Sequence, residues 1–181
     1  MIKKIILKIT ETYWNLKLDT ISQARKRGAK IGTNCRVYTR NFGSEPWLIE
    51  IGNNVTVTSE VTILTHDGST CLFNDKNGRR FLFQKTVIKN NVFIGVKSII
   101  MPGVVIEDNV IIAAGSVVTK SVPSGVIVAG NPAKIIGDYD INKSKVLSSY
   151  LSELDIDYTK TYKERILEVV DESIKPYLKK Q

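Results

Sequence analysis

Residues 88–123 read IKNNVF IGVKSI IMPGVV IEDNVI IAAGSV VTKSVP, in which an aliphatic residue opens every group of six. A second series of small or aliphatic residues stands four positions after each member of the first. A period of six matches neither the 3.6-residue repeat of an α-helix nor the two-residue alternation of a simple strand. The stretch therefore predicts a solenoid, in which each hexad supplies one short strand and one turn. A β-sandwich of short strands is the alternative, but it does not require six repeats without a slip.

The same period occurs nearer the N-terminus. Its members there are Ile31, Cys35, Val37, Ile51, Val55, Val57, Val61 and Ile63. Glycine, asparagine, aspartate and proline stand between the members, and these residue types tolerate the backbone geometry of tight turns. If three hexads close one triangular coil, complete coils span 51–68, 88–105 and 106–123, with an imperfect coil before them and a partial one after. No coil buries its apolar face alone, so the stack of coils is the predicted core.

Glycine placement divides the chain into three parts. All twelve glycines fall within residues 28–137, where we expect the β-helix domain, with an irregular loop at about 69–85. In the flanks, apolar residues recur at helical spacing, which predicts an amphipathic helical arm over 1–27 and a helical tail over 138–181. The apolar series of the tail is Ile166, Val169, Val170, Ile174, Tyr177 and Leu178, and Pro176 disturbs its last turn.

The composition is that of one folded domain with extensions: 181 residues, of which 43% are hydrophobic and 24% charged. The formal net charge is +8, and residues 1–30 hold eight basic against two acidic side chains. This excess fits either a solvated helix face or contact of the arm with an anionic membrane surface. Lysines interrupt the apolar run at the N-terminus, so we expect no signal sequence or transmembrane segment, and a cytoplasmic protein. The basic residues do not interleave with aromatic ones, which argues against nucleic-acid binding.

The repeat of aliphatic, glycine, two variable residues, a small residue and a variable residue resembles that of the hexapeptide-repeat acyltransferases. The resemblance covers about residues 28–137, and its most specific segments are 91–104, 113–120 and 129–134. It looks like the branch of sugar and antibiotic O-acetyltransferases, which includes maltose and galactoside acetyltransferases and enzymes of surface-polysaccharide clusters. The resemblance implies an all-β solenoid, a left-handed parallel β-helix of about four to five triangular coils with helical extensions. It also implies a homotrimer with active sites between subunits.

The single histidine of the chain, His66, stands just before the irregular loop. In the family that this chain resembles, a histidine at this place is the general base, and a neutral imidazole can take the proton of a sugar hydroxyl as it attacks a thioester. The acids Glu45 and Asp67 are both candidates to orient the imidazole. One histidine and two cysteines, Cys35 and Cys71, nearly exclude a zinc site built by one chain, and we expect no metal and two free thiols. The γ-class carbonic anhydrases share this fold but need three histidine ligands, which excludes them.

The resemblance also implies sites for both substrates. Acetyl-CoA is the implied co-substrate, with contacts from Phe93, Gly95, Ala114, Thr119, Lys120 and Lys134. Plain coil packing and solvated charge are the alternative roles of these residues. For the acceptor, the candidate residues are Tyr38, Asn41, Trp47, Asp67 and Phe73, and Arg79 and Arg80 of the loop are further candidates to shape its pocket. Packing between subunits of a trimer is the alternative role of the Trp47 segment and the loop.

We therefore expect an acetyl-CoA-dependent O-acetyltransferase that acts on a hydroxyl of a sugar or saccharide precursor, with His66 as general base. An antibiotic or amino-sugar acetyltransferase of the same fold is one alternative. A non-catalytic β-helix scaffold or binding module is the alternative of a different class.

Overall fold

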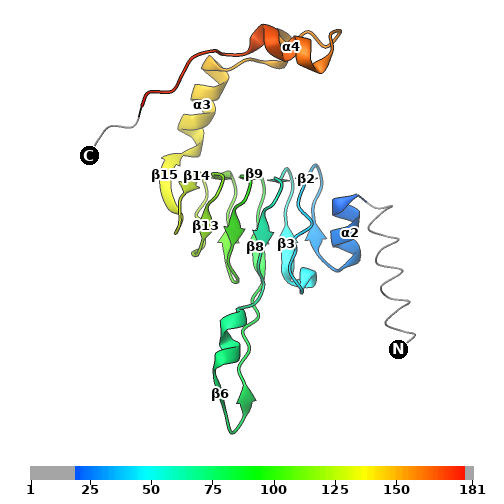
Figure 1. Cartoon of the computed structure of the whole chain (residues 1–181), viewed down its shortest axis with the longest axis vertical. Coiled ribbons are helices and arrows are strands. Elements are labelled where there is room, and N and C mark those ends of the chain that lie inside the picture. Colours follow the sequence, from blue (N-terminus) through cyan, green and yellow to red (C-terminus); the bar gives the residue numbers. More distant parts are fainter. Residues whose placement is uncertain (1–18, 178–181) are drawn as a thin grey trace. The chain divides into compact units, whose positions relative to one another are not determined.

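Three sheets of short strands form the body of the protein in the computed structural model, which describes residues 19–177 (Figure 1). Sheet A contains, in spatial order, β1 (Lys30–Ile31), β3 (Ile49–Ile51), β8 (Thr86–Ile88) and β11 (Val105–Ile106). Sheet B contains β2 (Arg36–Val37), β4 (Thr56–Val57), β9 (Val92–Ile94), β12 (Val110–Ile112), β14 (Val126–Ala129) and β15 (Lys134–Asp138). Sheet C contains β5 (Thr62–Ile63), β10 (Ile99–Ile100) and β13 (Val117–Val118). All pairs in these sheets are parallel except β14 with β15.

The chain visits sheets A, B and C in turn, so that three consecutive strands make one coil. Strands β3, β4 and β5 form one complete coil, β8, β9 and β10 the next, and β11, β12 and β13 the third. The pairing register aligns the first residue of each hexad with its counterpart in the next coil, as in the column Ile63, Ile100 and Val118. The predicted parallel β-helix with triangular coils is therefore confirmed.

The interior of the coils contains the two series of residues that the period identified. In the three complete coils, every member of either series is at most 4% exposed. Ser98 and Ser116 belong to the second series, and both hydroxyls donate to the carbonyl oxygen of Ala113, at 3.1 and 2.6 Å. These bonds satisfy the polar groups that the position buries. Cys35, in the first coil, is only half-buried, and both it and Cys71 are free thiols.

Asparagine residues stack at the corner where sheet A leads to sheet B. Asn34, Asn54, Asn91 and Asn109 all have left-handed backbone, with φ between 52° and 57°. Each side-chain amide donates to the amide oxygen of the next, at 2.6, 3.1 and 3.1 Å. Asparagine tolerates this backbone region better than most residues. The asparagines of the repeat thus serve two purposes: they adopt the backbone conformation of the turn, and they form a ladder of hydrogen bonds between coils.

The N-terminal end of the coil stack contacts a short helix, α2 (Thr20–Lys26). The Asp19 carboxylate accepts from the amides of Ile21 and Ser22, both at 3.0 Å, and caps the helix. Ala24 is buried, and Arg25 donates to the carbonyl oxygens of Ile31 and Gly32 in the first coil. The predicted helical arm is helical over these seven residues, and its residues 1–18 lie outside the part that the structure describes.

The predicted irregular loop leaves the coils after β5 and extends away from them (Figure 1). It contains a 3₁₀ helix, η2 (Gly68–Leu72), and a two-stranded antiparallel ribbon of β6 (Asn74–Asp75) and β7 (Gly78–Arg79). The chain rejoins sheet A at β8, in register with β3. The loop therefore interrupts the sequence period without interrupting the column of strands.

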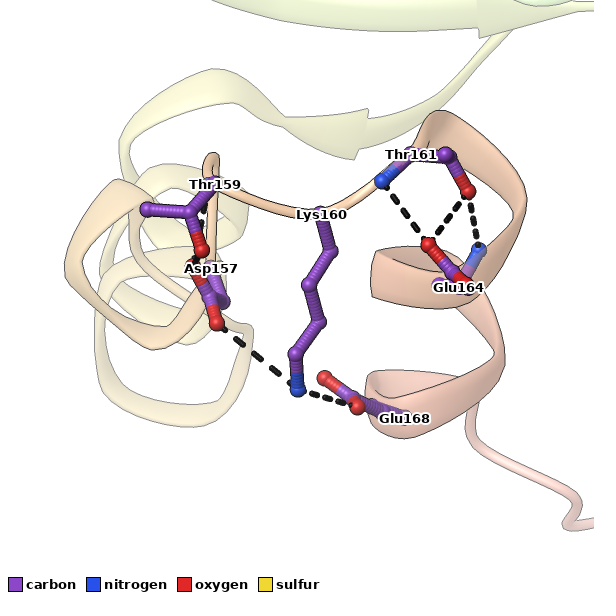
Figure 2. Close-up of polar contacts among 6 residues, drawn as sticks. All are labelled: Asp157, Thr159, Lys160, Thr161, Glu164 and Glu168. Carbon is purple, nitrogen blue, oxygen red and sulfur yellow. Dashed lines mark hydrogen bonds and ion pairs between the residues drawn. The ribbon is translucent and has the colours of Figure 1, made fainter.

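Residues from Ile141 onward form a separate compact unit. Helix α3 (Tyr139–Ser149) leads into it, followed by η3 (Glu153–Asp155) and α4 (Tyr162–Val169). Figure 2 shows its polar contacts: the Thr161 hydroxyl and the Glu164 carboxylate form a capping box at the start of α4, and Lys160 bridges Asp157 and Glu168. No described residue of α3 or α4 is buried.

The helical prediction for the tail was wrong over residues 170–177, because these residues adopt no regular structure. The Asp171 side chain accepts from the amide of Ser173 at 2.9 Å, which offers this backbone a local bond that competes with helix formation. Pro176 disfavours helical backbone at the residue before it. Among the described residues, no helix has the length and hydropathy needed to cross a membrane.

The asparagine ladder predicts a specific loss of stability. Asn91→Ala removes two side-chain hydrogen bonds between coils, and we expect the free energy of unfolding to fall by about 2 kcal/mol. Lys97→Ala is the matched control, because Lys97 has the same left-handed backbone, φ 62°, in the same coil but lies outside the ladder. Urea unfolding of both variants measures the difference, and an equal loss in the two would show that the ladder contributes nothing.

Candidate active site

His66 lies at the corner where sheet C leads to sheet A, three residues after Ile63 of β5. Its backbone pairs with Phe83 in an isolated antiparallel bridge, and the adjacent amide of Gln84 donates to the carbonyl oxygen of Thr65 at 2.8 Å. These contacts join the outgoing and returning arms of the loop at its base. The single histidine is therefore held where the loop leaves the coils, half-exposed, with 38% of its side chain accessible.

Glu45 is the acid that contacts the imidazole. Its Oε2 lies 2.8 Å from Nδ1 of His66 and also accepts from the Thr65 hydroxyl at 2.8 Å. Glu45 directly precedes the 3₁₀ helix η1 (Pro46–Leu48), and only 15% of its side chain is exposed. Burial raises the pKa of the Glu45 carboxyl, but the hydrogen bonds from His66 and Thr65 outweigh this effect and hold the pKa below its ordinary value.

The contact with Glu45 fixes the tautomer of the imidazole. An ionised carboxylate can only accept hydrogen bonds. Nδ1 of His66 therefore carries a hydrogen atom and donates a hydrogen bond to Oε2 of Glu45. In the neutral ring Nε2 then has no proton and presents its lone pair. This is the state that a general base requires.

Asp67, the other candidate, is directed elsewhere. Its carboxylate accepts from the amide and the hydroxyl of Ser69, at 2.8 and 2.7 Å, and so caps η2. Hydrogen bonds from Ser69 lower the pKa of Asp67, with a smaller effect of the nearby His66. Of the two acids that the sequence left open, the structure places Glu45 on the imidazole and Asp67 on the loop.

An open pocket of about 230 Å³ lies next to the imidazole. Besides His66, Glu45 and Asp67, it is lined by Ser44, Thr70, Arg79, Phe81, Leu82 and Phe83. Sequence reasoning missed Phe81 and Phe83, although the alternating pattern Phe-Leu-Phe directly before the period resumes was a usable signal. The pocket thus combines a base, a half-buried acid in contact with it and an aromatic wall.

The residues predicted to bind acetyl-CoA occupy two corners of the coils. Gly95 and Ala114 lie at the corner between sheets B and C, whereas Thr119 and Lys120 follow β13 at the corner between sheets C and A, as His66 follows β5. At Gly95 a Cβ atom would lie 2.4 Å from the backbone nitrogen of Ala114, so coil packing by itself requires glycine there. The structure therefore does not bring the whole set together within one chain.

The other predicted cofactor contacts lie on sheet B. Phe93, in β9, is 43% exposed and pairs in register with Ile111 of β12, and Lys134 is the exposed first residue of β15. Their predicted roles stay predictions.

Of the residues predicted to contact the acceptor or to shape its pocket, Asp67 and Arg79 line the pocket at His66, whereas Arg80 does not. Tyr38, Trp47 and Phe73 are exposed outside it, and the Asn41 amide donates to the Thr62 hydroxyl at 2.8 Å. Trp47 packs over Gly28, where a Cβ atom would lie 2.9 Å from the tryptophan Cβ. Their roles in acceptor binding also stay predictions.

The chain is similar in sequence to known proteins. Residues 85–120 match the family model described as bacterial transferase hexapeptide, six repeats. The chain is 46% identical to protein CapG of Staphylococcus aureus over 165 residues, which cover 88% of this chain and 93% of CapG.

Two solved structures extend the likeness to three dimensions. A maltose O-acetyltransferase from Clostridium difficile has a TM-score of 0.52 and 26% identity, and the match covers 72% of this chain and 83% of that one. A galactoside acetyltransferase in complex with coenzyme A has a TM-score of 0.59 and 26% identity, and the match covers 83% of this chain and 86% of that one.

These findings define a β-helical acetyltransferase that uses acetyl-CoA as co-substrate. The chain belongs to the hexapeptide-repeat transferase family, whose coils form a left-handed parallel β-helix.

The hydrogen bonds of Glu45 predict how stability depends on pH. Since its pKa is lower in the folded than in the unfolded chain, its ionised form stabilises the fold above pH 4.5, the ordinary value for glutamate, and this contribution is lost as the pH falls through the folded value. Thermal unfolding at neutral and acidic pH compares the wild type with Glu45→Gln. We expect the two melting temperatures to converge on acidification, because the ionised carboxylate that distinguishes the wild type from Glu45→Gln is then lost. A constant offset for Glu45→Gln would contradict the assignment.

Proposed function

We propose that this acetyltransferase transfers the acetyl group of acetyl-CoA to a hydroxyl of a sugar or saccharide precursor, with His66 as general base. The observation that carries the proposal is the hydrogen bond of 2.8 Å between Nδ1 of His66 and Glu45, beside a pocket with an aromatic wall. Aromatic faces and polar groups together suit a sugar ring. The names of the relatives, maltose O-acetyltransferase and galactoside acetyltransferase, support the same class of acceptor.

In the proposed reaction the acceptor hydroxyl attacks the carbonyl carbon of the thioester. The new C–O bond forms and the C–S bond breaks, while Nε2 of His66 takes the hydroxyl proton and returns it to the departing sulfur. The products are an acetyl ester and the free thiol of CoA. The chain need not form a covalent bond to the acetyl group.

Glu45 acts in this scheme as a positioning residue. By accepting from Nδ1 it leaves Nε2 as the basic nitrogen of the neutral ring, and it stabilises the imidazolium that forms when Nε2 is protonated. The Thr65 hydroxyl, which donates to the same oxygen, fixes the carboxylate in turn.

We further propose that acetyl-CoA lies between two subunits of a homotrimer. Gly95 and Ala114 allow close approach of the ligand to the backbone at one corner, with Phe93 near the reactive end, and Lys120 and Thr119 lie at the other corner with His66. Lys120 and Lys134 are the cations proposed to meet the phosphates. Sheet C separates the two corners within one chain. In the proposed trimer, one subunit therefore supplies the residues of one corner and its neighbour supplies those of the other.

The general-base role predicts that His66→Ala lowers kcat for acetyl transfer by about 10²- to 10⁴-fold. Binding of acetyl-CoA, measured by calorimetry, should change little, because the imidazole acts on the acceptor proton. Glu45→Gln retains a hydrogen-bond acceptor but no charge, so we expect a smaller fall in kcat. A His66→Ala variant with wild-type kcat would exclude the mechanism.

Sites between subunits predict complementation. His66→Ala and Ala114→Phe, which places a ring in the proposed cofactor path, should each be inactive as pure trimers. Refolding them together in equal amounts should restore about one quarter of the wild-type activity, since that fraction of neighbouring pairs combines an intact His66 with an intact Ala114. Light scattering checks the assembly state, and an active monomer would contradict the arrangement.

A further inference from the structure

A row of four side chains runs along the wall of the pocket, from the loop ribbon to the base. The guanidinium carbon of Arg79 lies 4.7 Å from the ring centroid of Phe81. Phe81 stacks on Phe83 with centroids 6.1 Å apart and planes within 9°, and Phe83 lies 6.0 Å from the imidazole of His66. The phenylalanines are 62% and 53% exposed, far more than any apolar side chain of the core. Exposed stacked rings next to a catalytic base are a surface for a ligand.

The charged side chains that line the pocket differ in whether they have polar partners. The Glu45 carboxylate is bound to His66 and Thr65, and the Asp67 carboxylate is bound to Ser69. Within residues 19–177, no ion pair involves Arg79, although its neighbour Arg80 pairs with Asp75. Arg79 is therefore the one arginine or lysine among the described residues that line this pocket, and no described acid forms an ion pair with it.

The guanidinium of Arg79 also has an aromatic partner in the pocket wall. The guanidinium lies over the face of the Phe81 ring, and the planar edge of a guanidinium matches a carboxylate or phosphate in a bidentate arrangement. A lysine at this position would present only a point charge. The stacked arginine is thus suited to recognise an anion of defined geometry.

Resting on the proposed function, we propose that Arg79 selects an acceptor saccharide that carries a carboxylate or a phosphate. Phe81 and Phe83 contact the apolar face of its sugar ring, and the reacting hydroxyl lies at Nε2 of His66. Because two aromatic rings separate the guanidinium from the imidazole, the anionic group lies beyond the ring that is acetylated. Glycosyl phosphates, and sugars joined to a sugar acid, have this arrangement.

Two pairs of acceptors test the proposal: lactose against lactobionate, in which the glucose unit is oxidised to an open-chain carboxylate, and galactose against galactose 1-phosphate. We expect a higher kcat/KM for at least one anionic member, and Arg79→Gln should reduce that preference by about tenfold. Arg79→Lys should keep part of it, and added salt should weaken it. The pair that shows the preference identifies the carboxylate or the phosphate as the recognised group.

Arg80→Gln is the control, because Arg80 is the adjacent arginine, paired with Asp75 and not among the residues that line the pocket. The acceptor preference should be the same in Arg80→Gln as in the wild type. An equal loss in both variants, or an unchanged preference in Arg79→Gln, would overturn the proposal.

A binding measurement separates this proposal from the proposed reaction. Calorimetry with the His66→Ala variant should detect lactobionate or galactose 1-phosphate, and adding Arg79→Gln should abolish the signal. Anion binding of this kind without any acetyl transfer by the wild type would support the role of Arg79 while refuting the reaction. Equal binding of anionic and neutral sugars would refute the role of Arg79 whether or not transfer occurs.

Discussion

Each coil of this protein is completed by the coil beside it. The backbone amides of one coil donate to carbonyls of the next, as Thr58 does to Ile94 and Gly95 to Ile112, and the aliphatic columns are buried only when stacked. This condition fixes the period, because a residue gained or lost in one coil would move every following side chain out of its column. The asparagines with left-handed backbone and the close approach of Gly95 to Ala114 both allow successive coils to stack in register.

The candidate site arises where this regularity is interrupted. Strand β5, the sheet C strand of the first complete coil, ends at Ile63. Within three residues the chain leaves the coils and enters the loop. Glu45 comes from the preceding irregular segment, so the acid and the base are both contributed by parts that lie outside the strands. The rigid columns on either side hold these parts at a distance of 2.8 Å, which a flexible loop alone would not maintain.

The fold of the coils could be predicted almost completely from the repeat. Every hexad indicates the same strand and turn, so a wrong assignment in one hexad would conflict with its neighbours. His66 was predicted as the base from its place before the loop, and Glu45 was one of two candidate partners. The sequence could not choose between Glu45 and Asp67, since the fold of residues 40–48 depends on contacts with distant coils. Phe81 and Phe83 were missed for the same reason: an aperiodic segment carries no signal for which face it presents. The tail was assigned too much helix because apolar spacing persists beyond Val169, while Asp171 and Pro176 favour other backbone states.

The base of the loop has a further consequence for how such a protein can diversify. The pairing of His66 with Phe83 and of Gln84 with Thr65 closes the excursion on itself, so its two ends meet regardless of what lies between them. Substitutions, insertions or deletions at the tip therefore leave the columns undisturbed. Packing constrains the residues of the coils but not those at the tip of the loop, so substitutions in the loop can change what the pocket binds without rebuilding the part that keeps the protein folded.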